Sequence, residues 1–570
     1  MKQKNDLLAV IQNIKLPKIN ILIAIIISII ASILGLLVPL FTGKLIDKLT
    51  HDIFNFKFLL IFIGVFVINT ILNGIGMYIL SKIGEYLIFS IRSMLWNHMI
   101  RLKLSFYDQS ESGQLLSRMI DDTKVINNFI SLKLPDLLPS ILMVIGSLFM
   151  LFILDWQLTI TIFIIIIIFL LCIYPLGQIM ERVSKKTQTE TANFSGLINK
   201  ILTHIYLMKA YNTEDIESKN GEDKLTDIYK LGIKQAKINS ILEPLSGLLI
   251  MMLVGSILSV GTWRVSQGEI SSGILVAMIF YVFQLVSPIS NLTSVITEYK
   301  KAKGASQRIS EILSEERENL NLTTSHKNIE GDILFKNVSF AYKEKVILDE
   351  VNFLIPKNKM TAFVGPSGSG KSTILKLIEK MYNIDKGEIL INGIKIENIN
   401  LKEWRKKVGY VIQGNSMLSG TIKENLLYGS DKIYSEKELD YYTDMAHCKE
   451  FIHSLKDGYA TEIGENGMKL SGGQQQRLSI ARSLIKNPSY FLLDEVTSNL
   501  DSESEQKIQS SLNELMKNKT TIIIAHRLST IKKADQIIFI DQGSITGIGT
   551  HSELMKTHSK YKDFVLTQHL

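Results

Sequence analysis

Long apolar runs in the first 300 residues limit the folds open to this chain more than any other feature. A helix needs about 20 apolar residues to cross a bilayer. Six segments meet that requirement: 19–41, 58–80, 134–154, 158–178, 241–263 and 273–296. The first segment is longer than the apolar part of a signal peptide and lacks a small-x-small cleavage site, so we expect an uncleaved membrane helix. The sequence therefore predicts an all-α polytopic membrane domain with six transmembrane helices.

The distribution of positive charge predicts how these helices are oriented. The formal net charge is +8, and most lysines and arginines before residue 300 lie in the linkers between spans two and three and between spans four and five. The short loops on the other side carry only Lys44, Lys48, Lys57 and Arg264. By the positive-inside rule we expect a multi-pass protein of the cytoplasmic membrane, with both termini and both long linkers in the cytoplasm. The net charge then needs no nucleic-acid partner.

Beyond about residue 300 the pattern changes to short β-rich runs that alternate with helical stretches. Examples are ILFKNVSFAY, KMTAFVG, YFLLDE and TTIIIAH. This alternation is typical of an α/β nucleotide-binding domain. We expect a membrane domain over 1–310, with cytoplasmic extensions of its helices, a linker over 311–330 and the α/β domain over 331–570. Cys172 and Cys448 fall in different halves, so no disulfide framework is implied.

A glycine-rich loop, GPSGSGKST at 365–373, follows an apolar strand and precedes a helical stretch. That context is the one a phosphate-binding loop requires, because backbone N–H groups and the helix N-terminus then converge on the phosphates. Lys371 is expected to reach the β- and γ-phosphates and Ser372 to ligate Mg²⁺. The apolar run YFLLDE at 490–495 delivers Asp494 beside this loop, as a second Mg²⁺ partner, and Glu495 as a general base for the attacking water.

Further motifs make the chain similar to a known family. LSGGQ lies at 470–474, SNLD at 498–501 and IIIAHR at 522–527. In this order, with six spans ahead of them, the motifs resemble a bacterial ABC exporter half-transporter of the multidrug and lipid-flippase type. The loop TEIGENG at 461–467 resembles one that exporters carry and importers generally lack.

The resemblance implies roles for individual residues. Tyr342 would stack on adenine, Gln413 would touch Mg²⁺, and His526 would contact the γ-phosphate. Ser471 and the amides of Gly472 and Gly473 would grip ATP held by a second copy, which favours a homodimer or a pair with a similar half-transporter. With the phosphate loop, the expected ATP-binding set is Tyr342, Gly365, Ser367, Gly368, Gly370, Lys371, Ser372, Thr373, Gln413, Ser471, Gly472, Gly473, Gln474, Asp494 and Asp501.

The membrane half also carries residues that are candidates for contact with the transported substrate, and segments that are candidates for coupling the two domains. Polar residues recur along the sixth span at spacings of three and four, as one stripe: Gln284, Ser287, Asn291, Ser294 and Glu298. Such a stripe faces either a cavity or another helix. Asn69 and Asn73 lie one turn apart in the second span, where helix packing is the better interpretation. Segments 112–123 and 209–217 resemble the cytoplasmic coupling segments of exporters.

These observations predict ATP hydrolysis coupled to export or flipping of an amphipathic drug, lipid or peptide. Few charges lie within the spans, which disfavours a small ion or a highly charged solute as cargo. A dedicated peptide or bacteriocin exporter and a nucleotide-gated channel are the alternatives. A nucleic-acid-associated ATPase is a third, and the six spans argue against it.

Overall fold

The computed structural model describes residues 14, 16–50, 56–110, 112–320, 329–412, 414, 416–494, 518–525 and 527–567. The chain divides into two compact units. The first contains Met1–Met99 and Ser112–Ser314, and the second contains Ile100–Glu111 and Glu315–Leu570. A short piece of the linker between spans two and three therefore belongs to the C-terminal unit.

The first unit is helical and confirms the six expected spans. Six helices among the described residues are long and apolar enough to cross a membrane. They are α2 (Lys18–Thr50), α3 (Phe56–Met99), the stretch that ends in α7 (Leu134–Leu154), α8 (Trp156–Thr203), α10 (Glu214–Ser266) and α11 (Ser272–Ser314). The stretch before α7 runs through α5 (Ser112–Ser117), η1 (Arg118–Asp122), α6 (Thr123–Asn127) and η2 (Asn128–Lys133).

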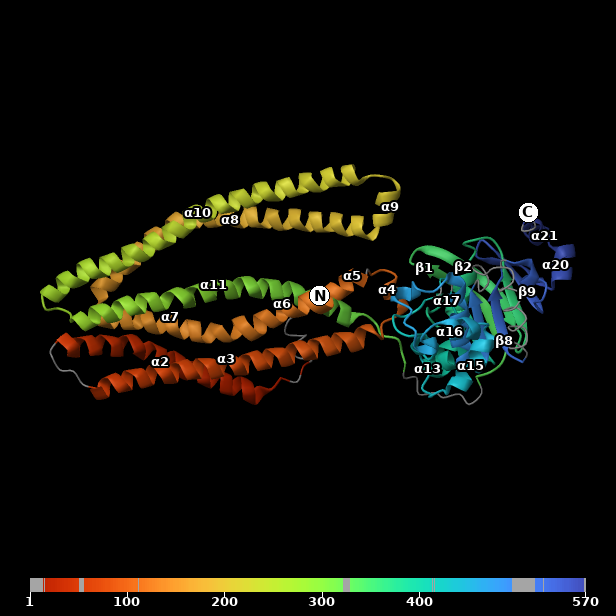
Figure 1. Ribbon diagram of the computed structural model, residues 1–570, viewed down its shortest axis with the longest axis horizontal. Helices are drawn as coiled ribbons and strands as arrows, with labels where there is room; N and C mark the ends of the chain where they lie inside the picture. Colours follow the sequence, from red (N-terminus) through yellow and green to blue (C-terminus); the bar gives the residue numbers. More distant parts are fainter. Residues whose placement is uncertain are drawn as a thin grey trace. The chain divides into compact units, whose positions relative to one another are not determined.

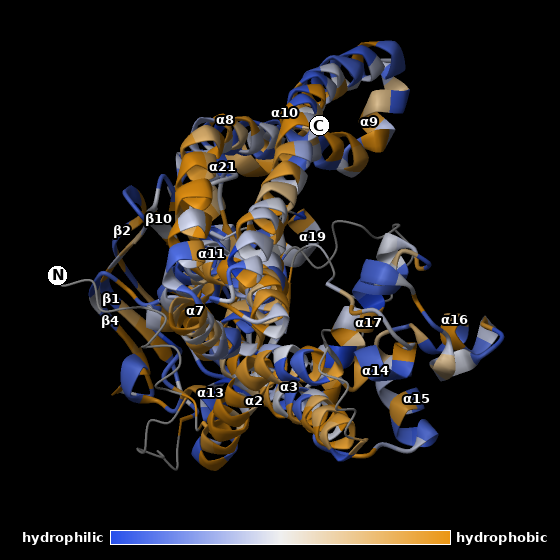
Figure 2. Cartoon of the chain, turned by 90° about the vertical axis from the view of Figure 1, so that its left-hand side faces the viewer, coloured by the Kyte–Doolittle hydropathy of each residue, from blue (hydrophilic) through white to orange (hydrophobic). Residues whose placement is uncertain are grey.

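Helices α8 and α10 form a long hairpin that is closed by α9 (Ile205–Ala210) (Figure 1). The other long helices pack together, with α2 against α3 and α11 against α2 and α7. Apolar residues run along α2 and α7, as Figure 2 shows. The helices extend well past the 20 or so residues that a bilayer requires.

The second unit contains two sheets. One is antiparallel, in the order β2-β1-β4-β5, and the other has the order β10-β9-β3-β8-β7-β6. In the larger sheet β9, β3, β8, β7 and β6 are parallel, and β10 pairs antiparallel with β9. The strands are β1 (Ile333–Tyr342), β2 (Lys345–Ile355), β3 (Met360–Val364), β4 (Lys386–Ile391), β5 (Ile394–Lys395), β6 (Val408–Val411), β7 (Tyr490–Asp494), β8 (Thr520–Ile524), β9 (Gln536–Asp541) and β10 (Ser544–Gly549).

The helices of this unit begin with α4 (Leu104–Tyr107), which comes from the membrane-domain linker. The others are α12 (Lys371–Ile378), η3 (Ile396–Asn398), α13 (Leu401–Lys407), α14 (Ile422–Leu426), α15 (Glu436–Met445), α16 (Lys449–Ser454), η4 (Gly458–Ala460), η5 (Glu465–Gly467), α17 (Gly472–Ile485), α19 (Leu528–Ile531), α20 (His551–Thr557) and α21 (Ser559–Thr567).

Two apolar cores hold the second unit together. One contains side chains of both sheets, including Phe335, Phe353 and Phe363, together with Trp404 of α13. The other joins the larger sheet to the helices α14 to α17. Burying these side chains contributes about 25 cal/mol for each Å² of apolar surface removed from water. The larger sheet is thereby fixed with the ends of its parallel strands aligned, and this alignment positions the site.

Candidate functional site

The glycine-rich loop joins β3 to α12 with a backbone that only glycine adopts easily. Gly365, Gly368 and Gly370 have φ angles of +152°, +77° and +105°. A Cβ on Gly365 would lie 2.0 Å from the carbonyl oxygen of Ile540, so no larger residue fits there. A Cβ on Gly368 would meet nothing within 4 Å, which leaves the loop open on that side. The loop therefore has the tight turn and the open backbone that close contact with a phosphate requires.

Lys371 opens α12, and its ammonium group folds back over the loop. The residue is only 6% exposed. Its Nζ donates hydrogen bonds to the carbonyl oxygens of Gly365 (2.9 Å) and Pro366 (2.7 Å). The buried Oγ of Ser369 has no hydrogen-bond partner among the described residues. A buried cation beside an unsatisfied hydroxyl fits a triphosphate, which supplies both the negative charge and the missing acceptors.

Ser372 and Asp494 meet as the sequence predicts. β8 separates β3 from β7 in the parallel sheet, so both loops emerge at the same edge. The Ser372 Oγ lies 3.4 Å from the Asp494 Oδ1, and Asp494 is 4% exposed. Thr373 is buried one residue further along α12. A hydroxyl and a buried carboxylate side by side are oxygen ligands of the kind that Mg²⁺ prefers.

Tyr342 ends β1 within a group of aromatic rings. Phe340 and Tyr382 both pack edge-on against it, with ring centroids 4.9 and 5.2 Å away. The Lys376 Nζ lies 5.9 Å from the centre of the Tyr342 ring. The sequence predicts Tyr342 as the base-stacking residue but gives no indication of Tyr382, which becomes its neighbour only in the fold.

The LSGGQ motif begins a helix and does not form a second phosphate loop. Ser471 is the N-cap of α17 and shares a capping box with Gln474. The Ser471 N–H donates to the Gln474 Oε1 (2.9 Å), and the Gln474 N–H donates to the Ser471 Oγ (3.3 Å). Gly472 and Gly473 occupy the first turn of α17, so their backbone N–H groups lie at the N-terminus of the helix.

The two helix starts have different neighbours within the chain. Helix α17 packs against α14, α15 and β6, whereas α12 packs against β7 and β8. Both helices therefore pack on the larger sheet, α17 against its edge strand β6 and α12 against β7 and β8.

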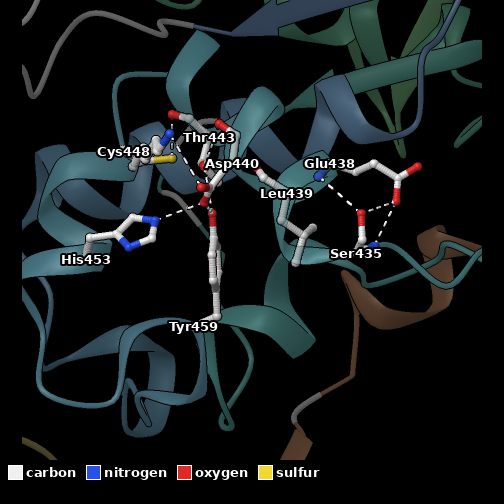
Figure 3. Close-up of polar contacts among 9 residues, drawn as sticks. Ser435, Glu438, Leu439, Asp440, Thr443, Cys448, His453 and Tyr459 are labelled. Carbon is white, nitrogen blue, oxygen red and sulfur yellow. Dashed lines mark hydrogen bonds and ion pairs between the residues drawn. The ribbon is translucent and has the colours of Figure 1, made fainter.

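A polar cluster around Asp440 holds α15, α16 and η4 together (Figure 3). The Asp440 carboxylate accepts hydrogen bonds from the Tyr459 hydroxyl (2.8 Å) and from His453 (2.9 Å). The Tyr459 hydroxyl also lies 2.8 Å from that of Thr443, and the Cys448 thiol donates to the Thr443 carbonyl. Burial raises the pKa of Asp440, but the hydrogen bonds from His453, Tyr459 and Lys449 outweigh it and lower the pKa below its usual value. Asp440 is therefore a charged link between α15, α16 and η4.

Four expected site residues lie outside the described residues: Gln413, Glu495, Asp501 and His526. Their roles stay predictions.

The residues of the membrane unit that are candidates for substrate contact form hydrogen bonds between and within helices. The Gln284 Nε2 donates to the carbonyl oxygen of Gly35 in α2 (3.0 Å), and its buried Oε1 has no partner among the described residues. The Asn73 Nδ2 donates to the Asn69 Oδ1 (2.9 Å). Asn291 is half-buried, and its carbonyl oxygen accepts from the Ser294 hydroxyl. Helix packing thus accounts for the Nε2 of Gln284, whereas its Oε1 is available to accept a hydrogen bond.

The first segment that resembles a coupling segment belongs to the membrane unit, and its coupling role stays a prediction. Residues 112–123 form α5, η1 and the start of α6 within the membrane unit. There the Asp122 carboxylate accepts hydrogen bonds from Arg308 of α11, and Arg92 of α3 donates to the Thr123 hydroxyl. The part that joins the nucleotide-binding unit is Ile100–Glu111, directly before that segment. The second expected segment, 209–217, forms the turn between α9 and α10.

Comparison with known proteins identifies the architecture. The model of the ABC transporter transmembrane region matches residues 21–289, and the ABC transporter model matches residues 348–498. A multidrug resistance ABC transporter ATP-binding and permease protein of Lactococcus lactis subsp. lactis (strain IL1403) is 37% identical over 92% of this chain and 89% of its own length. An ATP-dependent lipid A-core flippase of Haemophilus influenzae (strain 86-028NP) is 33% identical over 89% of this chain and 87% of its own length.

Six membrane-spanning helices, a phosphate loop that meets a buried carboxylate and these similarities along nearly the whole chain lead to one conclusion. The chain belongs to the ABC transporter family, as an exporter half-transporter that joins a membrane domain to an ATP-hydrolysing domain.

Proposed function

We propose that this chain exports or flips an amphipathic substrate across the cytoplasmic membrane, driven by ATP hydrolysis in a dimer. The observation that carries the proposal is the meeting of Lys371, Ser372 and Asp494 at one sheet edge, in a chain with six membrane-spanning helices. The nucleotide-binding unit lies on the cytoplasmic side, as the positively charged linkers favour. Nucleotide binding biases a two-state cycle in which the membrane domain opens to one side of the membrane or to the other.

In this proposal each residue of the nucleotide site has a distinct task. Lys371 binds the β- and γ-phosphates, and Tyr342 stacks on the adenine. Ser372 and Asp494, with Gln413, hold Mg²⁺, which would neutralise charge on the phosphates. Glu495 accepts a proton from the attacking water, and His526 contacts the γ-phosphate. Ser471, with the N–H groups of Gly472 and Gly473, binds the γ-phosphate of a nucleotide held by a second copy, aided by the N-terminus of α17.

Substitution of the proposed base tests the catalytic part. Glu495→Gln keeps the size of the side chain and removes its ability to accept a proton, so ATP turnover should fall at least about 100-fold. Binding of ATP, measured by isothermal titration calorimetry on the purified protein in nanodiscs, should stay within about twofold of wild type. Asp457→Asn, in the turn before η4, is a matched carboxylate-to-amide control that should leave turnover unchanged. Full turnover in Glu495→Gln would contradict the assigned base.

The substrate class follows from the membrane unit and from the relatives. The curated relatives are named for multidrug resistance and for flipping of lipid A-core. Glu298, the charged member of the polar stripe, lies beyond the expected span 273–296, and within that span the stripe offers the amides of Gln284 and Asn291 and the hydroxyls of Ser287 and Ser294. Such groups suit a hydrogen-bonding amphipath better than an ion.

Transport is tested in liposomes that contain the purified protein. ATP should drive movement of a fluorescent amphipathic dye or a labelled lipid, and Glu495→Gln should abolish this movement. ATP-dependent movement of an unstructured peptide alone would favour the dedicated peptide exporter. Electrical conductance in ATP-treated bilayers, without movement of dye, lipid or peptide, would instead indicate a channel.

A further inference from the structure

A short segment of the membrane-domain linker is built into the nucleotide-binding unit. Residues Ile100–Glu111, which include α4, belong to the same compact unit as Glu315–Leu570. Lys103 forms an ion pair with Glu316, and the Asp108 carboxylate accepts a hydrogen bond from the Tyr382 hydroxyl. Lys103, Asp108, Tyr342 and Tyr382 all line one cavity of about 1100 Å³. The segment therefore reaches the residues around the proposed adenine-stacking ring.

Tyr382 connects that segment to Tyr342. Its ring stands nearly perpendicular to the Tyr342 ring, at 89°, with the centroids 5.2 Å apart. Phe340 contacts both rings edge-on, with centroids 4.9 Å from Tyr342 and 5.6 Å from Tyr382. Edge-to-face aromatic pairs have a preferred geometry, so the orientation of one ring restricts that of the next. The three rings therefore move together more easily than separately.

The hydroxyl of Tyr382 is held in its role as a donor. Burial raises its pKa, and the hydrogen bond to Asp108 raises it further. The phenol stays protonated at neutral pH and donates to a carboxylate, which is the stronger kind of hydrogen bond. Asp108 thus fixes one end of Tyr382, while the ring at the other end fixes Tyr342.

We propose that Tyr382 is a positioning residue for nucleotide recognition, anchored by Asp108, which orients Tyr342 to stack on the adenine. The affinity for the base then depends on a residue that lies between spans two and three. This inference rests on the proposed function, because it takes Tyr342 as the stacking residue. Triphosphate binding by Lys371 does not involve Tyr382. Loss of the Tyr382 hydroxyl should therefore weaken binding of the base and leave binding of the triphosphate unchanged.

The test compares ATP with inorganic tripolyphosphate, which lacks the base, by calorimetry on the full-length protein in nanodiscs. Tyr382→Phe keeps the ring and removes the hydroxyl, and Asp108→Ala removes the acceptor. Each should weaken ATP binding by about threefold to tenfold, the range expected for one hydrogen bond, and leave tripolyphosphate binding unchanged. The double variant should lose no more than either single variant, because both break the same bond. Asp108→Asn keeps an acceptor oxygen without the charge, so it should weaken ATP binding less than Asp108→Ala does.

Steady-state kinetics give an independent readout. A residue that only positions the base should raise KM for ATP and leave kcat unchanged. Equal weakening of ATP and tripolyphosphate, additive losses in the double variant, or a loss in Asp108→Asn as large as in Asp108→Ala would overturn the inference.

A further variant, Tyr342→Ala, separates this inference from the proposed site. If Tyr342→Ala weakens ATP but Tyr382→Phe does not, the site stands and the positioning role fails. If Tyr342→Ala binds ATP like wild type, Tyr342 is not the stacking residue, and the proposed adenine site itself is wrong.

Discussion

Among single residues, Glu379 has a buried carboxyl group whose ionisation lowers the stability of the nucleotide-binding unit. It follows α12 directly and is 9% exposed, and its Oε2 has no hydrogen-bond partner among the described residues. Burial raises its pKa to about 7, although the positive charges of Arg405 and Lys486 act in the opposite direction. A carboxyl whose pKa is raised by folding stabilises the fold while protonated. That stabilisation is lost as the pH rises through about 7.

We therefore expect Glu379→Gln to stabilise the protein increasingly as the pH rises to about 7, and by a constant amount above it. The neutral amide avoids the cost of a buried charge, worth on the order of 1–3 kcal/mol at pH 8.5. The thermal midpoint of the full-length protein in nanodiscs, measured from pH 5.5 to 8.5, should exceed that of wild type by a margin that grows up to about pH 7 and is constant above it. Glu388→Gln, at a carboxylate whose pKa is lowered by Lys395, is the control and should show no such gain. A wild-type midpoint that does not fall relative to Glu379→Gln as the pH rises would contradict this reasoning.

At the scale of elements, α2 and α11 approach so closely that only glycine fits between them. A Cβ on Gly273 would lie 2.1 Å from the carbonyl oxygen of Gly43 and 2.5 Å from the Asp47 carboxylate. That carboxylate accepts hydrogen bonds from the Ser271 hydroxyl and the Gly273 N–H, both at 2.7 Å, and so caps the start of α11 from another helix. Small residues allow such close packing in membranes, where packing drives helix association.

Gly273→Ala should force the two helices apart and destabilise the membrane unit by about 1–3 kcal/mol, as overpacking does. The thermal midpoint of the protein in nanodiscs should fall. Gly255→Ala in α10 is the matched control, because a Cβ there would meet nothing within 4 Å. Equal midpoints for the two variants would show that the contact between α2 and α11 does not limit stability.

Some features at the level of the elements can be predicted from the sequence, and others cannot. Bilayer length alone predicts the six spans, and strand–loop–helix order predicts the meeting of Ser372 with Asp494, because both are local or topological rules. The pairing of Asp108 with Tyr382 joins positions more than 250 residues apart, and no spacing rule connects them. Residues 112–123 continue as helix into the third span, so their helical pattern gives no sign that the boundary between the two units falls between Glu111 and Ser112.

At the scale of the whole molecule, the phosphate loop and the LSGGQ motif open two separate helices, α12 and α17. Within one chain α17 packs against β6, α14 and α15, whereas α12 packs against β7 and β8. If two copies face each other and share two ATP sites, each chain should carry an intact phosphate loop and an intact LSGGQ motif on separate elements. In the proposed function the working unit is a symmetric dimer, in which each site takes Lys371 from one copy and Ser471 from the other.

Mixing two inactive variants tests this arrangement. Lys371→Ala removes the phosphate-binding cation, and Ser471→Arg blocks the LSGGQ motif. Each variant alone should therefore show almost no ATP turnover. In a mixed dimer of the two, one site receives both substitutions and the other receives neither. Random mixing before reconstitution should therefore restore about one quarter of wild-type turnover, since half of the dimers are mixed and each has one intact site of two.

The controls for this experiment use the same variants. Each variant mixed with itself should stay inactive, and turnover should rise as the ratio of the two approaches unity. If Lys371 and Ser471 of one chain served the same site, every site in a mixed dimer would carry one substitution and turnover would stay at the background. An ATPase rate at background across all ratios, with mixed dimers verified by two affinity tags, would contradict the shared site.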